Sequence, residues 1–160
     1  MTRFNVKKVA VLGAGVMGAQ IAAHLVNVQV PVVLFDLPAK EGEKNAIVTR
    51  AIANLKKLKP SPLGVAEDAE LIQAANYEEH LKLLKECDLV IEAIAFHIAS
   101  TPDIYTKIAP FVAKHAIVAS NTSGLSITKL SEVLPDALKP RFCGIHFFNP
   151  PRYMPLVELI

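Results

Sequence analysis

Three glycines, Gly13, Gly15 and Gly18, stand between a strand-like segment and a stretch with helical periodicity. Val6 to Leu12 predicts a strand, and residues 13–28 predict a turn that leads into a helix. In this context each glycine has a physical role. Gly13 permits a tight turn, Gly15 lets the backbone approach a pyrophosphate, and Gly18 lets the helix pack closely on the strand. The spacing therefore predicts a loop that binds a dinucleotide.

The helix start and the end of the next strand complete this pattern. Val16 and Met17 begin the predicted helix, where free N–H groups and a partial positive charge favour phosphate. Val30 to Phe35 predicts a fully buried strand that ends at Asp36, eighteen residues after Gly18. The Asp36 carboxylate would accept hydrogen bonds from the adenine-ribose hydroxyls and repel a 2′-phosphate, so NAD is favoured over NADP. The alternative is a tight turn followed by an ordinary loop aspartate.

The rest of the chain alternates short apolar runs with helical stretches. This alternation predicts an α/β fold of the Rossmann type, a doubly wound and mostly parallel sheet with helices on both faces. Further strands are expected near Ile72 and over residues 88–95, 116–120, 142–147 and 156–160, and further helices over residues 40–59, 103–113 and 126–134. Because the last strand reaches the chain end, we expect residues 1–160 to be one dinucleotide-binding domain of a longer protein.

Composition narrows the choice of partners and compartment. The net charge is only +2 and both signs are interspersed, so neither nucleic acid nor an anionic membrane is expected as a partner. The uncharged segment from Val9 to Phe35 is broken by glycines and polar residues, which argues against a membrane span and a signal peptide. Cys87 and Cys143 lack metal-ligand spacing, so no metal is expected and the cytoplasm, a reducing compartment, is predicted.

Polar side chains gather around two later strands. Asn121 and Ser123 follow one predicted strand, and His146 and Asn149 lie on or just after the next. In a doubly wound sheet these positions converge at the carboxyl ends of the strands, near the nicotinamide of a bound dinucleotide. Histidine is suited to take a proton near neutral pH, although a satisfied histidine among aromatic residues is an equal alternative at His146. Glu158, twelve residues on, either orients the imidazole or is a solvated surface charge.

Four stretches of the sequence together resemble the NAD-binding domain of the 3-hydroxyacyl-CoA dehydrogenase family. They are KVAVLGAGVMGAQIA, DLVIEAIA, ASNTSGLSIT and RFCGIHFFNPPRYMPLVELI, and they are spread over nearly the whole chain. The last two are specific to this family. Its members oxidise L-3-hydroxyacyl-CoA in fatty acid β-oxidation. The stretch LKKLKPSP is most similar to the large bacterial or multifunctional type, in which this domain is joined to further domains.

The resemblance implies a role for individual residues. His146 corresponds to the general base that takes the proton of the 3-hydroxyl group, and Glu158 to its acidic partner. Ser123 corresponds to the serine that hydrogen-bonds the substrate oxygen. The residues that correspond to contacts of the NAD cofactor lie in the glycine loop and at the strand ends: Gly13, Gly15, Val16, Met17, Gly18, Asp36, Ala93, Asn121 and Asn149.

The sequence departs from the family pattern in two places. Phe96 and Thr101 stand where the family usually has a glutamate and, five positions later, a lysine that contact cofactor or substrate. The helical C-terminal domain, which in the family supplies part of the active site, the acyl-CoA pocket and the dimer interface, is absent after Ile160. We therefore expect the isolated chain to bind NAD but to turn over poorly, and the full-length protein to be a homodimer that acts on 3-hydroxyacyl-CoA. The alternatives are a short-chain 3-hydroxybutyryl-CoA dehydrogenase and a catalytically silent NAD-binding module.

Overall fold

The structure is a computed structural model that describes residues 3–95 and 101–160. These residues form one sheet of seven strands in the order β3-β2-β1-β4-β5-β6-β7. The strands are β1 (Val9–Leu12), β2 (Val32–Asp36), β3 (Ile72–Asn76), β4 (Leu89–Glu92), β5 (Ile117–Ser120), β6 (Phe142–Phe147) and β7 (Val157–Leu159). All neighbouring strands are parallel except β6 and β7, which are antiparallel. The predicted Rossmann-type, mostly parallel α/β fold is confirmed.

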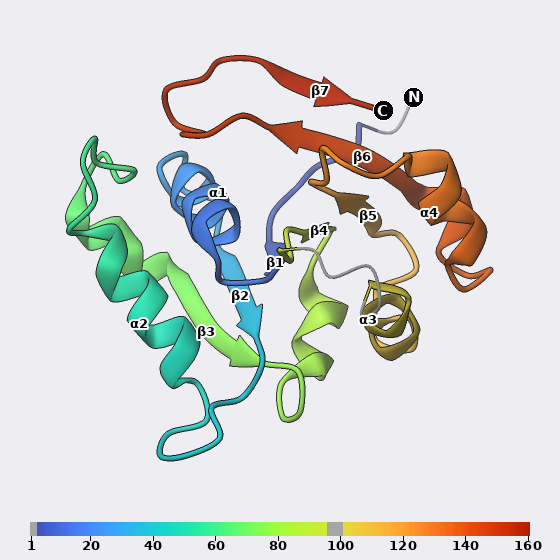
Figure 1. Cartoon of the computed structure of the whole chain (residues 1–160), viewed down its shortest axis with the longest axis horizontal. Coiled ribbons are helices and arrows are strands. Elements are labelled where there is room, and N and C mark those ends of the chain that lie inside the picture. The colour runs from blue at the N-terminus through green and yellow to red at the C-terminus, as the bar shows by residue number, and fades with distance from the viewer. Residues whose placement is uncertain (1–2, 96–100) are drawn as a thin grey trace.

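Helices cover both faces of this sheet (Figure 1). The helices are α1 (Val16–Val26), α2 (Ala46–Leu55), α3 (Thr101–Ile108) and α4 (Ile127–Val133), with shorter 3-10 segments η1 (Ala66–Leu71), η2 (Leu81–Glu86) and η3 (Lys139–Arg141). Successive strand residues point to opposite faces. Val9 and Val11 therefore pack with α1 and α2, whereas Ala10 and Leu12 pack with α3 and α4. Burial on both faces explains why β1 contains only apolar residues.

The path of the chain places a crevice beside β1. The first three strands run outward from β1 through β2 to β3, and the chain then returns to place β4 on the other side of β1. Neighbouring connections thus leave the carboxyl ends of β1 and β4 in opposite directions. At such a point of an open parallel sheet the loops diverge, and ligands bind there. The glycine loop that follows β1 lies at this position.

Several predicted element limits agree with the structure, and others do not. The helix predicted over residues 103–113 ends at Ile108, and the strand predicted over residues 88–95 ends at Glu92. The strand β6 covers the predicted residues 142–147, and Ser126 caps α4 by accepting a hydrogen bond from the Lys129 N–H group. The helix predicted over residues 40–59 is shorter, because α2 begins only at Ala46 and ends at Leu55. Gly42, with φ of +75°, lies in the turns that precede it, in a conformation that a helix does not contain. Within the described part of the chain, no helix is long and apolar enough to cross a membrane.

Candidate active site

The glycine loop connects β1 to α1 and has the geometry that a bound pyrophosphate requires. Gly13 has φ of +101°, and a Cβ added there would lie 2.8 Å from the Ala93 carbonyl oxygen. A Cβ at Gly18 would lie 1.8 Å from the Gly13 carbonyl oxygen, so only glycine lets α1 pack this closely. At Gly15 a Cβ would meet nothing within 4 Å, which leaves open space beside the helix start. Gly15 therefore faces the space where a phosphate can approach the backbone.

The Asp36 carboxylate lies at the end of β2 and holds this loop. Its Oδ2 accepts a hydrogen bond from the Ala14 N–H group at 2.7 Å, and its Oδ1 accepts one from the Leu37 N–H group at 2.7 Å. Asp36 also lines a cavity of about 430 Å³ together with Gly13 and Gly15. Each carboxylate oxygen keeps a second lone pair, with which it can accept a hydrogen bond from a ribose hydroxyl.

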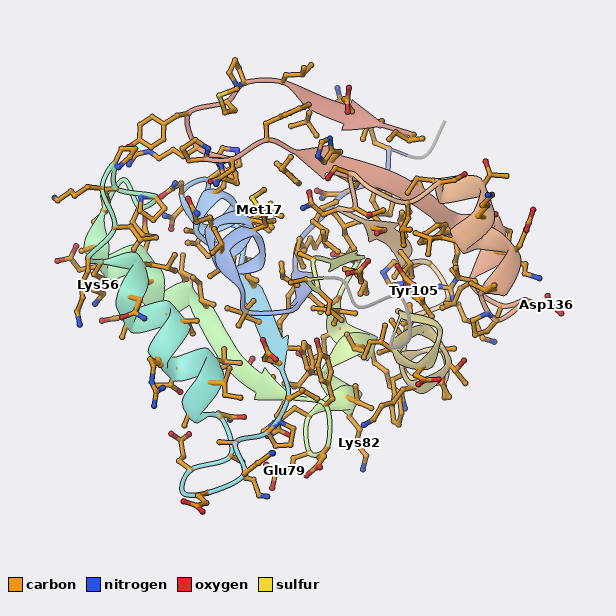
Figure 2. The ribbon with its side chains drawn as sticks, in the orientation of Figure 1. Met17, Lys56, Glu79, Lys82, Tyr105 and Asp136 are labelled. Atoms are coloured by element: carbon orange, nitrogen blue, oxygen red, sulfur yellow. The ribbon has the colours of Figure 1, made fainter. Side chains whose placement is uncertain are left out.

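A second cavity, of about 270 Å³, lies beyond the glycine loop between β4 and β5. It is lined by the start of α1 and by the loops that follow the two strands, namely Gly15, Val16, Met17, Glu92, Ala93, Ile94, Ala95, Asn121, Thr122 and Ser123. Met17 lies at the N-terminal end of α1, as Figure 2 shows. The structure thus brings the predicted residues Val16, Met17, Ala93, Asn121 and Ser123 to one cavity. Gly18 lines neither cavity, because its place is against the loop backbone.

Asn121 connects this cavity to the neighbouring strand. Its Oδ1 accepts a hydrogen bond from the Phe147 N–H group at 2.9 Å, so the loop after β5 is fixed to the end of β6. Among the described residues, the Nδ2 group of Asn121 has no hydrogen-bond partner, so it can donate to a ligand. Ser123 is exposed two residues further along this loop, and the buried Ser120 hydroxyl accepts from the Thr122 N–H group at 3.3 Å. These hydrogen bonds fix the start of the loop, which presents polar groups to the cavity.

His146 and Glu158 form a pair on the two antiparallel strands. They are register partners of β6 and β7, and His146 Nδ1 lies 3.0 Å from Glu158 Oε2. The imidazole packs against the Phe148 ring with centroids 4.6 Å apart. A carboxylate only accepts hydrogen bonds, so in a neutral imidazole that donates to Glu158 the proton is on Nδ1 and the lone pair is on Nε2. This arrangement can act as a general base at Nε2.

The pair and Asn149 lie outside the two cavities of the dinucleotide crevice. His146, Glu158 and Asn149 line neither of them. Asn149 is exposed after β6, and its Oδ1 accepts a hydrogen bond from the Gln20 side chain at 3.5 Å. Gln20 belongs to α1, so this contact holds the segment after β6 near the helix that follows the glycine loop. Phe96 and the Thr101 side chain, where the sequence departs from the family pattern, lie outside the described part of the structure.

Glu92, which sequence reasoning missed, is a buried carboxylate at the end of β4. Its Oε1 accepts from the Ile94 N–H group at 2.6 Å, and its Oε2 accepts from Ser120 Oγ at 2.7 Å and the Tyr105 hydroxyl at 3.2 Å. Burial raises the pKa of Glu92, and the three hydrogen bonds oppose that shift. The signal in the sequence is a single charged residue inside the apolar run 89–95.

The fold and the crevice together define a class of protein. A doubly wound sheet, a glycine loop at its switch point and a carboxylate at the end of the second strand form the dinucleotide-binding domain of a dehydrogenase. Residues 8–160 match the family model of the 3-hydroxyacyl-CoA dehydrogenase NAD-binding domain, and the chain belongs to this family. The domain binds NAD. The glycine loop and Asp36 fit that cofactor, because Gly15 leaves space for the pyrophosphate and Asp36 offers acceptors for the ribose.

Relatives and solved structures agree with this assignment. A putative fatty acid oxidation complex trifunctional enzyme of Rickettsia felis is 48% identical over 98% of this chain and 22% of that protein. A probable 3-hydroxyacyl-CoA dehydrogenase of Deinococcus radiodurans is 41% identical over 98% of this chain and 45% of that protein. The crystal structure of (S)-3-hydroxybutyryl-CoA dehydrogenase from Ralstonia eutropha matches with a TM-score of 0.76 and 33% identity, over 97% of this chain and 54% of that one. This chain therefore spans between about a fifth and about half of these proteins.

Proposed function

We propose that this chain is the cofactor-binding part of an enzyme that uses NAD to oxidise L-3-hydroxyacyl-CoA to 3-ketoacyl-CoA in fatty acid β-oxidation. The observation that carries the proposal is the hydrogen bond of 3.0 Å between His146 Nδ1 and Glu158 Oε2. It leaves His146 Nε2 as an oriented base at the end of the sheet where the dinucleotide crevice lies. The names of the relatives support the substrate class.

The residues of the chain divide the work between proton transfer and positioning. His146 Nε2 accepts the proton of the 3-hydroxyl group, and the Glu158 carboxylate stabilises the imidazolium that results. Ser123 donates a hydrogen bond to the substrate oxygen. Bound NAD supplies the acceptor for the hydride that leaves C3. Ala93, Asn121 and Asn149 position the nicotinamide half of the cofactor.

The adenosine half is bound by the loop after β1 and the carboxylate after β2. Gly13 and Gly15 approach the pyrophosphate, and the N–H groups of Val16 and Met17 at the helix start donate toward it. Asp36 accepts hydrogen bonds from the ribose hydroxyls and excludes a 2′-phosphate by charge repulsion, which favours NAD over NADP.

The remaining part of the active site comes from outside this chain. We expect a helical C-terminal domain to complete the acyl-CoA pocket and to form the interface of a homodimer. The isolated 160-residue chain then binds NAD but turns over slowly. The cytoplasm is the expected compartment, since Cys87 and Cys143 are both free thiols.

A short-chain 3-hydroxybutyryl-CoA dehydrogenase is the second candidate. The similarity to the (S)-3-hydroxybutyryl-CoA dehydrogenase of Ralstonia eutropha, at 33% identity, favours it. A catalytically silent NAD-binding module is the third, because Phe96 and Thr101 replace two charged residues of the family pattern.

One assay separates these candidates. The chain, joined to the C-terminal domain of its longer protein, is assayed for NADH oxidation with acetoacetyl-CoA and with long-chain 3-ketoacyl-CoA. We expect both to react, and His146→Gln to lower kcat by about 10²- to 10⁴-fold while NAD affinity stays within about twofold. Activity with acetoacetyl-CoA alone indicates the short-chain enzyme. No activity with either substrate indicates the silent module, and full activity of His146→Gln contradicts the role of the base.

A further inference from the structure

Glu92 is a residue with a buried carboxylate that lines the cavity between β4 and β5. Only 1% of the residue is exposed, yet it lines the cavity of about 270 Å³ together with Ala93, Asn121 and Ser123. The proposed function places the nicotinamide ring in this cavity, and the present inference depends on that placement. Glu92 has no role in the proton transfer assigned to His146.

Burial raises the pKa of Glu92, but the hydrogen bonds that it accepts oppose this shift and fit an ionised carboxylate. Three groups donate to it: the Ile94 N–H group, the Ser120 hydroxyl and the Tyr105 hydroxyl. Ser120 Oγ itself accepts from the Thr122 N–H group, so its own proton is directed to Glu92. Tyr105 projects from α3 toward the sheet (Figure 2), where it is fully buried. With three donors and two acceptor oxygens, a negative charge is the form that uses all of these bonds.

No opposite charge compensates Glu92 within the described part of the chain. All three donors are neutral, and none of the ion pairs found there includes Glu92. The titratable groups that face it are Tyr105 on α3 and Tyr77 after β3, and burial raises the pKa of both phenols, which keeps them neutral. The negative charge is thus exerted on whatever enters the cavity, in surroundings that screen it weakly.

We propose that Glu92 sets the preference of this domain for the oxidised over the reduced cofactor by placing a buried negative charge beside the nicotinamide. The oxidised nicotinamide ring carries a positive charge, whereas the dihydronicotinamide ring is neutral. A buried carboxylate on a residue that lines their common cavity therefore stabilises the bound oxidised form selectively. In an enzyme that oxidises a hydroxyl group, this charge favours the form of the cofactor that starts the reaction.

A purely structural role for Glu92 makes a different prediction. The same hydrogen bonds join the loop after β4 to the end of β5 and to α3, so losing them would disturb the cavity for any occupant. Affinity for the oxidised and reduced cofactors would then fall by the same factor. The ratio of the two dissociation constants separates charge from positioning.

Glu92→Gln in the 160-residue chain tests the proposal, because it removes the charge and keeps the side-chain shape. Dissociation constants are measured for NAD⁺, NADH and ADP-ribose by calorimetry. We expect the ratio of NAD⁺ to NADH dissociation constants to rise about five- to tenfold, with ADP-ribose affinity nearly unchanged. Tyr105→Phe removes one hydrogen bond but retains the charge, and Glu86→Gln removes an exposed charge elsewhere. Neither control should change the ratio.

The outcomes distinguish this inference from the proposed function. Equal losses of NAD⁺ and NADH affinity in Glu92→Gln, or an unchanged ratio, overturn the role of Glu92 and leave the cofactor site intact. Equal affinity of the wild-type chain for NAD⁺, NADH and ADP-ribose overturns the placement of the nicotinamide and the inference with it. If Glu92→Gln does not fold, the same inference is tested by a measurement on the wild-type chain. By linkage, bound NAD⁺ must lower the pKa of the Glu92 carboxyl relative to bound NADH. Carbon-13 NMR of the wild-type chain measures this pKa with each cofactor. If the two values do not differ, the inference is overturned.

Discussion

His146 and Glu158 lie directly opposite each other on β6 and β7, with 3.0 Å between Nδ1 and Oε2. The contact depends on the direction of β7. Among the described strands only β7 runs antiparallel to its neighbour, so the chain reverses after β6 and brings a carboxylate back to the imidazole. The Glu158 side chain is 49% exposed, whereas the His146 side chain is only 16% exposed. The carboxylate therefore contacts the imidazole from the solvent side.

The first prediction concerns this pair. Glu158→Gln in the full-length enzyme removes the charge that stabilises the imidazolium and can hold the wrong tautomer of His146. We expect kcat to fall by about 10²-fold, with the KM for acyl-CoA changed less. Steady-state NADH oxidation measures both constants. Glu132→Gln, an exposed change on α4, is the matched control and should have no effect. A Glu158→Gln enzyme with normal kcat would show that Glu158 does not act on the base.

Much of the fold could be predicted because the strands are short apolar runs with clear limits. β6 begins after the basic residue Arg141 and ends where aromatic residues give way to Asn149, and its limits were predicted correctly. The predicted start of α2 was wrong, because residues 40–45 lack an apolar pattern that would distinguish a helix from turns. Their conformation is set by Gly42 and by local backbone hydrogen bonds such as that from the Ala39 N–H group to the Lys44 carbonyl.

In the candidate site, contacts that follow local sequence rules could be predicted, whereas contacts between distant residues could not. The glycine loop and Asp36 follow local rules of spacing, so their juxtaposition could be predicted from the sequence. Glu92 could not, because its partners Ser120 and Tyr105 are 28 and 13 residues away and meet it only in the folded core. A charged residue in a buried strand signals that a partner exists, without indicating which one.

The second prediction concerns Asp36 and the choice of cofactor. Asp36→Ser removes the carboxylate that we propose to accept hydrogen bonds from the ribose and to repel a 2′-phosphate. We expect NAD affinity to fall about tenfold and the preference for NAD over NADP to disappear, as measured by calorimetry with both cofactors. Asp103 lines the same cavity, so Asp103→Asn serves as the control. We expect this variant to keep the preference for NAD over NADP. If the wild-type chain binds NADP as well as NAD, Asp36 has a different role.

The third prediction separates the two functions of the glycine loop. Gly18→Ala places a Cβ 1.8 Å from the Gly13 carbonyl oxygen, whereas a Cβ at Gly15 meets nothing within 4 Å. We expect Gly18→Ala to lower the free energy of unfolding by at least about 3 kcal/mol, as measured by urea denaturation. Gly15→Ala should change it by less than about 0.5 kcal/mol but weaken NAD binding at least tenfold, because the methyl group occupies the phosphate space. Loss of stability in Gly15→Ala, or its absence in Gly18→Ala, would contradict this division.

The fourth prediction uses the pH dependence of stability at Asp88, which joins three parts of the chain. Its carboxylate accepts hydrogen bonds from the N–H groups of Lys7 at 2.7 Å and Lys8 at 3.2 Å, and its Oδ1 lies 2.7 Å from His115 Nε2. The hydrogen bond with His115, followed by those with the backbone, lowers the pKa of Asp88 below its ordinary value. In the unfolded chain the carboxyl has that ordinary value, so ionised Asp88 stabilises the folded state.

The sign of the effect follows from the lowered pKa. The stabilisation is fully present above the ordinary pKa of an aspartate and is lost as the pH falls through the lower value of the folded state. Asp88→Asn should therefore lower the melting temperature at pH 7 by about 2–5 °C, and this difference should shrink in acid. Thermal unfolding of both proteins across the acidic range measures it. Asp136→Asn is the control, because Asp136 pairs with Lys139 on the surface, where its side chain is 96% exposed, and its loss should leave the melting temperature unchanged. A difference for Asp88→Asn that persists undiminished in acid would show that the carboxylate charge does not contribute.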